Sequence, residues 1–181
     1  MIKNIDKLSP NDALIVLKKL WDNYPELKKD ILIEAEKILS DIDKNEIAED
    51  VFWVLNNIDV HELWDRSGSS RDGYTSPGDM AVEMIEEELE PFNNEVNKYH
   101  NLKMAEQAKQ YCMGVLKGIY EFDKESQSEF KDWATDIPPE CFGYLLDEWK
   151  EKCKRKKDLE EMDEFIKREC PDWAKWAITK K

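Results

Sequence analysis

The sequence predicts an all-α protein, built from antiparallel helical hairpins that form an irregular α–α superhelix or a compact helical bundle. Glycine is scarce, at 6 of 181 residues, whereas short strands joined by tight turns would need more of it. Hydrophobic residues make up 41% of the chain, which is enough for a core despite 38% charged residues. Apolar residues recur at helical spacing, but without a repeat of about 34 residues, so a regular tetratricopeptide array is not expected.

The first helix begins at a strong start signal in residues 9–12. Ser9 can cap the helix, Pro10 suits its first position, and Asp12 lies near its positive end. Pro25 ends this helix, and a polar turn at residues 41–44 separates the second helix from the third. The apolar stripes of the three helices are Leu14, Leu17, Leu20, Trp21 and Tyr24, then Leu27, Ile31, Ala35 and Ile38, then Ile47, Val51, Val54, Leu55 and Ile58. Because the turns are short, we expect these helices to pack as antiparallel neighbours.

A short helix and a long loop come next. Residues 59–66 fit one or two helical turns, and residues 67–79 contain three of the six glycines and no aliphatic side chain. Residues 76–79 repeat the start signal of residues 9–12, with Ser76 as cap and Pro77 at the first position. The helix that they open meets Pro91, where we expect a kink or a restart.

Residues 104–122 are apolar around most of a helix, which is typical of a central helix covered on several sides. Gly114 and Gly118 lie one turn apart on it and permit close approach of another helix. Shorter helical segments follow, around Phe142 and Trp149, around Phe165, and after Pro171. We therefore expect a helical-hairpin core domain at residues 1–122, with residues 123–181 as a C-terminal helical extension packed on it.

The four cysteines are widely separated, so we expect reduced, buried thiols rather than disulfides or a zinc site. No apolar stretch reaches the roughly 18 residues of a membrane span, and residues 1–6 carry no signal segment. We accordingly expect a cytoplasmic protein without a membrane role and without a cofactor. A net charge of −14 argues against direct binding of nucleic acid.

The charge is unevenly distributed along the chain. Residues 41–95 hold sixteen acidic residues against Lys44, Arg66 and Arg71, whereas residues 150–157 hold six basic residues and one acidic residue. The basic segment of one copy could pair with the acidic half of another in a homo-oligomer. The alternative is a solvated helix end whose lysines complement the helix dipole.

Residues 59–79 are the best candidate for a binding surface, because loops supported by helices often carry function. The candidate binding residues are Glu62, Trp64, Asp65, Arg66, Arg71 and Tyr74. We expect the two arginines to pair with nearby carboxylates and the two aromatic residues to anchor the loop to the core. No catalytic residue is assigned, since no nucleophile has a base and an orienting partner in a recognisable pattern.

A divalent metal site near this loop is an alternative. His61 and Asp65 are four residues apart and share a helical face, and Glu83 and Glu87 on the next long helix could complete a ligand set. The ordinary interpretation is that these side chains are solvated or hydrogen-bonded. The same applies to the run of glutamates from Glu83 to Glu90, which suits the start of a helix.

Four segments resemble a family of uncharacterised prokaryotic all-helical proteins. They are residues 59–68 (DVHELWDRSG), 72–74 (DGY), 87–92 (EELEPF) and 114–120 (GVLKGIY). The stretch is similar to helical regions that accompany SWIM-type zinc fingers. Because proteins with such fingers are thought to bind other macromolecules, the resemblance implies a binding function. The finger itself is absent, because the chain lacks paired cysteines followed by a histidine, and no catalytic residue is carried over.

Three functions follow as hypotheses. The first is a non-enzymatic protein-interaction or scaffold module whose partner is basic where it meets residues 41–95. The second is a ligand-binding or divalent-metal-binding protein, or an enzyme, with its site at residues 59–79. The third is an acidic mimic of nucleic acid that inhibits a basic protein.

Overall fold

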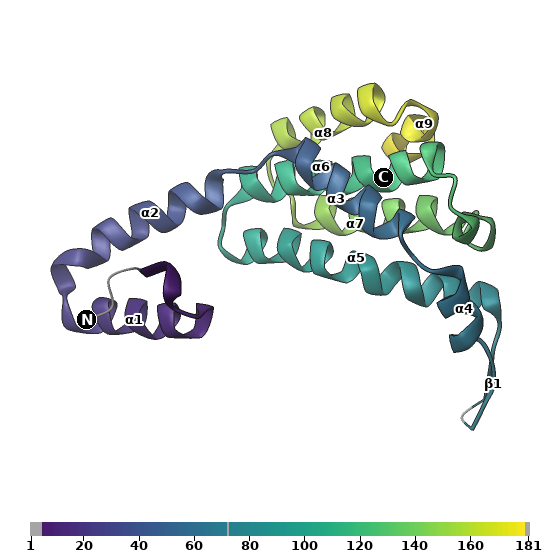
Figure 1. Cartoon of the computed structure of the whole chain (residues 1–181). Coiled ribbons are helices and arrows are strands. Elements are labelled where there is room, and N and C mark those ends of the chain that lie inside the picture. Colours follow the sequence, from purple (N-terminus) through teal and green to yellow (C-terminus); the bar gives the residue numbers. More distant parts are fainter. Residues whose placement is uncertain (1–4, 72, 180–181) are drawn as a thin grey trace. The chain divides into compact units, whose positions relative to one another are not determined.

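The structure is a computed structural model that describes residues 5–71 and 73–179; Asp72 of the expected loop lies outside these ranges. The described chain is helical apart from one short β-hairpin (Figure 1), which confirms the predicted all-α class. It divides into two compact units, Met1–Asp41 and Ile42–Lys181.

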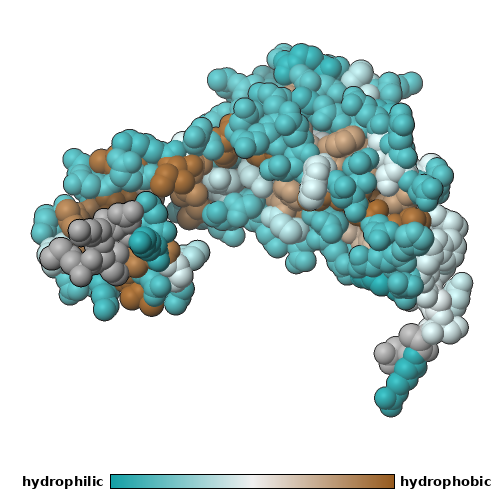
Figure 2. All heavy atoms as spheres, in the orientation of Figure 1, coloured by the Kyte–Doolittle hydropathy of each residue, from teal (hydrophilic) through white to brown (hydrophobic). Residues whose placement is uncertain are grey.

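The first unit contains the short 3-10 helices η1 (Ile5–Lys7) and η2 (Pro25–Leu27) and the helices α1 (Pro10–Asn23) and α2 (Lys28–Ser40). The predicted start of α1 is confirmed, because the Ser9 side chain accepts a hydrogen bond of 3.2 Å from the Asp12 backbone amide. None of the described side chains of α1 and α2 is buried. Apolar residues therefore lie at the surface of this unit (Figure 2), among them Leu14, Leu17, Leu32, Ile33 and Ile38.

The second unit is arranged around one central helix. Its elements are α3 (Lys44–Asn56), α4 (Val60–Arg66), β1 (Gly68–Ser70), β2 (Gly73–Thr75), α5 (Pro77–Asn101), α6 (Ala105–Glu125), η3 (Glu129–Trp133), α7 (Ile137–Lys152), α8 (Lys156–Glu169) and α9 (Pro171–Thr179). Helix α6 packs against α3, α5, α7 and α8. Most of its side chains from Ala108 to Phe122 are buried, which confirms that this helix is central.

Helices α3 and α6 cross closely at two glycines. A Cβ on Gly118 would lie 2.6 Å from both the Ala48 carbonyl oxygen and Val51 Cβ, and one on Gly114 would lie 2.8 Å from Ile47 Cβ. The antiparallel packing expected of the first three helices stays a prediction, because α1 and α2 lie in the first unit and α3 in the second. Helix α3 can pack this closely on α6 because the glycines at positions 114 and 118 have no side chain.

The segment before α5 differs from the predicted loop. Strands β1 and β2 pair antiparallel, with Ser69 opposite Tyr74, and form a hairpin that projects from the second unit (Figure 1). Gly68 has φ 103°, a value that favours glycine. Helix α5 then begins at its predicted cap, Ser76, and continues through Pro91 without a restart.

Helices α7 to α9 complete the core around α6. The Trp173 ring of α9 meets Phe142 of α7 and Tyr120 of α6 edge-on, each with ring centroids 5.1 Å apart. These contacts place residues 137–179 on the same core as α3, α5 and α6. The observed division, between Asp41 and Ile42, does not coincide with the boundary expected after residue 122, and a distinct C-terminal extension at residues 123–181 stays a prediction.

Candidate functional site

An acidic groove lies between α5 and α7. It has a volume of about 840 Å³ and is lined by five glutamates, by Asn93 and by five apolar or aromatic side chains. The glutamates are Glu83, Glu86, Glu87 and Glu90 of α5 and Glu140 of α7. The other five are Val82, Leu89, Ile137, Cys141 and Tyr144. Leu89 is buried, whereas Tyr144 is 72% exposed. The groove thus combines carboxylates, apolar side chains and one exposed aromatic ring.

Helical spacing explains why the glutamates gather there. On α5 they stand at positions i, i+3, i+4 and i+7, which share one face of a helix. The buried residues Met84, Ile85 and Leu89 lie on another face of α5, toward the core. A sequence that looks like an undivided acidic run therefore yields a stripe of carboxylates on the side of α5 that faces the groove.

Arg66, from α4, reaches one of these carboxylates. Its guanidinium donates two hydrogen bonds of 2.7 Å to the two oxygens of Glu87, and it lies 3.6 Å from Glu62. The hydrogen bonds to Glu87 are the main cause of the raised pKa of Arg66, and they lower the pKa of Glu87. Within the described residues, the other four groove glutamates have no ion-pair partner.

Two further groups distinguish the groove. The Asn93 side-chain oxygen is buried and has no hydrogen-bond partner among the described residues. Burial, followed by the charges of Glu86 and Glu140, raises the pKa of the Cys141 thiol to about 11. Cys141 is therefore protonated at neutral pH and lines the groove as a small apolar group rather than a nucleophile.

The binding residues predicted from the sequence are only partly brought together. Arg66 pairs with Glu62 and Glu87, as expected of an arginine among acids. Trp64 packs edge-on against Trp133, with ring centroids 4.8 Å apart, but stays 49% exposed. Tyr74 is 70% exposed on β2, so the prediction that it anchors the loop in the core is wrong. Asp65 and Arg71 are exposed.

The predicted metal candidates have other roles in the structure. His61 is exposed on α4, and its backbone amide donates to Asp59, which caps that helix. Glu87 is bound by Arg66, and Glu83 lines the acidic groove. In residues 5–71 and 73–179, the group of carboxylates close enough to hold a metal ion lies elsewhere, at Glu106, Asp158 and Glu161.

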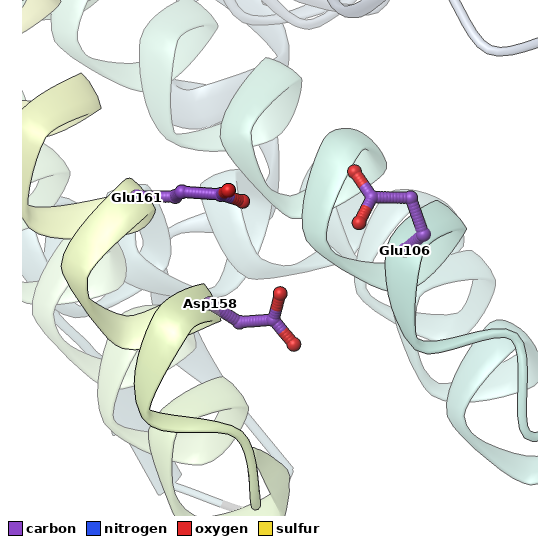
Figure 3. Close-up of side chains that lie close together, drawn as sticks. All are labelled: Glu106, Asp158 and Glu161. Carbon is purple, nitrogen blue, oxygen red and sulfur yellow. The ribbon is translucent and has the colours of Figure 1, made fainter.

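These three carboxylates point toward one another across the interface of α6 and α8 (Figure 3). A protein cation already occupies the space among them. The Lys109 ammonium lies 2.8 Å from Glu106 and 3.1 Å from Asp158, and it also donates to Glu161. Lys109 is only 2% exposed and Asp158 only 4%. The cluster is therefore an ion-pair network that joins two helices, with Lys109 and Asp158 at its buried centre and Glu106 and Glu161 toward solvent.

The pKa directions agree with this interpretation. Burial alone would lower the pKa of Lys109, but hydrogen bonds to the three carboxylates outweigh burial and raise it. Burial would likewise raise the pKa of Asp158, but hydrogen bonds from Lys109 and Arg155 lower it. All of these groups are therefore charged at neutral pH, and the ammonium takes the place that a metal ion would need.

Sequence reasoning missed both the groove and this network. A signal for the groove was present, because Glu83, Glu86, Glu87 and Glu90 follow helical spacing and Glu140 starts a later helix. A signal for the network was also present, because Lys109 stands among apolar residues of a helix predicted to be central. Such a lysine needs anionic partners. Nothing local in the sequence pointed to Asp158 and Glu161 as those partners.

In the parts of the chain that the structure describes, no helix has the length and apolar character needed to cross a membrane. Comparisons of the chain with protein-family models, curated proteins and solved structures found no match. The resemblance to helical regions accompanying SWIM-type zinc fingers stays a prediction.

Proposed function

We propose that the protein is a non-enzymatic interaction module whose acidic groove binds a basic, amphipathic helix of a partner protein. The observation that carries this proposal is one groove lined by five glutamates and by apolar side chains, in which four glutamates lack a cationic partner among the described residues. Four free cysteines support the expected cytoplasmic location, since such thiols are usually paired in oxidising compartments.

The spacing of the glutamates favours a helical ligand. From Glu83 to Glu90 the carboxylates extend over about 10 Å along α5, at 1.5 Å per residue. Lysines or arginines at positions i, i+3 or i+4, and i+7 of a helix have the same spacing. A partner helix lying along α5 would bring each basic side chain opposite a glutamate, with its apolar side chains toward Leu89, Ile137 and Cys141.

Arg66 is an internal example of this recognition. Its planar guanidinium forms a two-point contact with Glu87, the geometry that makes arginine the preferred partner of a carboxylate. Tyr144 supplies an exposed aromatic ring beside the glutamates, and such rings are frequent anchors at interfaces. The unpartnered Asn93 oxygen can accept a hydrogen bond from a bound lysine or arginine.

Two other functions remain alternatives. An enzyme or metal site at residues 59–79 has less support, because Arg66 and Glu87 satisfy each other and His61 is exposed. An acidic mimic of nucleic acid would use the same net charge of −14. Binding by a mimic would depend on overall charge, whereas binding in the groove depends on particular glutamates, so matched variants distinguish the two.

The test compares two triple variants with the same change of net charge. The groove variant is Glu83→Gln, Glu86→Gln and Glu90→Gln. The control variant is Glu26→Gln, Glu36→Gln and Glu49→Gln, at exposed positions outside the groove. Proteins captured from native cell extract by each form are identified. The affinity of a purified partner, and of its basic segment, is then measured by calorimetry.

The proposal predicts a partner whose affinity falls at least tenfold for the groove variant and changes less than twofold for the control variant. Equal losses for both variants would indicate charge mimicry instead. A partner that binds both variants as well as wild type would place the binding surface outside the groove.

A further inference from the structure

A second pocket, of opposite charge, lies where the α5–α6 turn meets the α7–α8 turn. It has a volume of about 210 Å³, which corresponds to roughly seven water molecules. We call it the basic pocket, because its lining includes Lys103, Lys152, Lys154 and Arg155, together with His100. Asp158 also lines it, but that carboxylate is already bound by Lys109 and Arg155. In a chain of net charge −14, this is a local concentration of positive charge.

Trp149 also lines this pocket and carries a buried donor. Its side chain is 2% exposed, and its indole Nε1 has no hydrogen-bond partner in the described part of the chain. An indole N–H can only donate, and a buried donor without an acceptor is unfavourable. His100 Nε2, also in the pocket lining, is likewise buried and lacks a partner among the described residues. Two residues that line one small pocket thus each have a buried ring nitrogen that needs a partner.

Two of the lysines that line the pocket are available to an anion. Lys152 is bound to Glu148 and Asn97, but Lys103 and Lys154 have exposed side chains with no ion-pair partner in the described residues. Lys103 has φ 61°, a backbone conformation that glycine or asparagine usually adopts after a helix. Burial and the nearby charge of Lys152 lower the pKa of His100, so its neutral ring can present an N–H from Nε2.

We propose that the basic pocket binds a phosphate group, with one oxygen accepting from Trp149 Nε1 and the others facing Lys103, Lys154 and His100. The pocket is large enough for a phosphate but not for a bulky ligand. Phosphate is preferred to a carboxylate because it carries up to two negative charges and more acceptor oxygens, which suit several donors. This site is separate from the acidic groove, so either proposal can fail without the other.

The indole N–H of Trp149 is itself the probe. Wild-type protein labelled with ¹⁵N is titrated with inorganic phosphate at constant ionic strength, and the indole signals are followed by NMR. The Trp149 signal is assigned with Trp149→Phe. We expect a saturable shift of that signal, and affinity for phosphate at least tenfold higher than for acetate.

Paired lysine variants locate the anion. Lys103→Gln with Lys154→Gln should weaken phosphate binding at least tenfold. The control pair, Lys167→Gln with Lys175→Gln, removes two exposed lysines of the same unit outside the pocket and should change affinity less than twofold. The proposal is overturned if the Trp149 signal does not saturate, if acetate binds equally well, or if both pairs behave alike.

Discussion

The Lys109 ammonium of α6 donates a hydrogen bond of 3.1 Å to the Asp158 carboxylate of α8, and both side chains are almost fully withdrawn from solvent. This contact joins residues 49 positions apart and fixes the last long helix to the central one. It also indicates that the carboxylates of Glu106, Asp158 and Glu161 stabilise the packing of two helices rather than hold a metal ion. Asp158 also lines the basic pocket.

Replacing Lys109 tests the network directly. We expect Lys109→Met to lower the free energy of unfolding by about 3 kcal/mol, because the buried Asp158 would lose its buried cation and keep only the exposed Arg155 as partner. Adding Asp158→Leu should restore most of that loss, since a buried ion pair can be exchanged for apolar residues at little cost. Urea unfolding measures both values. A single variant within about 0.5 kcal/mol of wild type would contradict the assignment.

The stability should depend on acid through Asp158. Its pKa is lowered in the folded protein, because hydrogen bonds from Lys109 and Arg155 outweigh burial. The stabilisation is therefore fully present above the unfolded pKa of about 4 and is lost as the pH falls through the lower folded pKa. Urea unfolding from pH 6 to pH 2 should show a smaller acid loss for Asp158→Asn than for wild type, from a lower starting stability. Parallel curves would exclude Asp158 as a contributor.

The crossing of α3 and α6 should not tolerate a methyl group. Gly118→Ala would place a Cβ 2.6 Å from Ala48 and Val51, and we expect a loss of about 2 kcal/mol in the free energy of unfolding. Gly78→Ala is the matched control, because its nearest neighbour is 3.8 Å away. In the first turn of α5 it should be neutral or stabilising by up to about 1 kcal/mol. Equal effects, measured by thermal or urea unfolding, would rule out the close crossing.

The two units should differ in local stability. Helices α1 and α2 have no buried side chain among the residues described, whereas α6 is buried along most of its length. We expect backbone amides of α1 and α2 to exchange with deuterium at least about 100-fold faster than those of α6. Exchange is measured by mass spectrometry on the intact chain. Equal protection would mean that the α1–α2 unit is covered in solution, by a partner or by another copy.

Much of the fold could be predicted from local signals. Ser9 and Ser76 cap helices as expected, because a serine followed by proline and then aspartate satisfies the first turn by short-range contacts. The central position of α6 followed from its apolar circumference. At Pro91 a kink or a restart was expected; no restart occurs, because the packing of α5 on both sides of Pro91 maintains one helix.

The site was harder to predict, because it depends on which helices become neighbours. The glutamates of α5 follow one face, but a groove exists only because α7, about 50 residues later, lies alongside α5. Trp64 and Tyr74 were expected in the core, yet the hairpin carries Tyr74 away from it. Composition alone does not show where a short hairpin points, and aromatic residues at its tip or base can stay exposed.

The most direct test of the central claim is photo-crosslinking from the rim of the acidic groove. A photoreactive amino acid replaces Tyr144, which is 72% exposed, or Tyr74, which is 70% exposed on the hairpin. The proposal predicts that position 144 crosslinks a partner peptide with lysines or arginines at helical spacing, and that Glu83→Gln with Glu86→Gln and Glu90→Gln abolishes the crosslink. Crosslinking of a partner from position 74 alone, unaffected by those substitutions, would contradict it and place the binding surface on the hairpin.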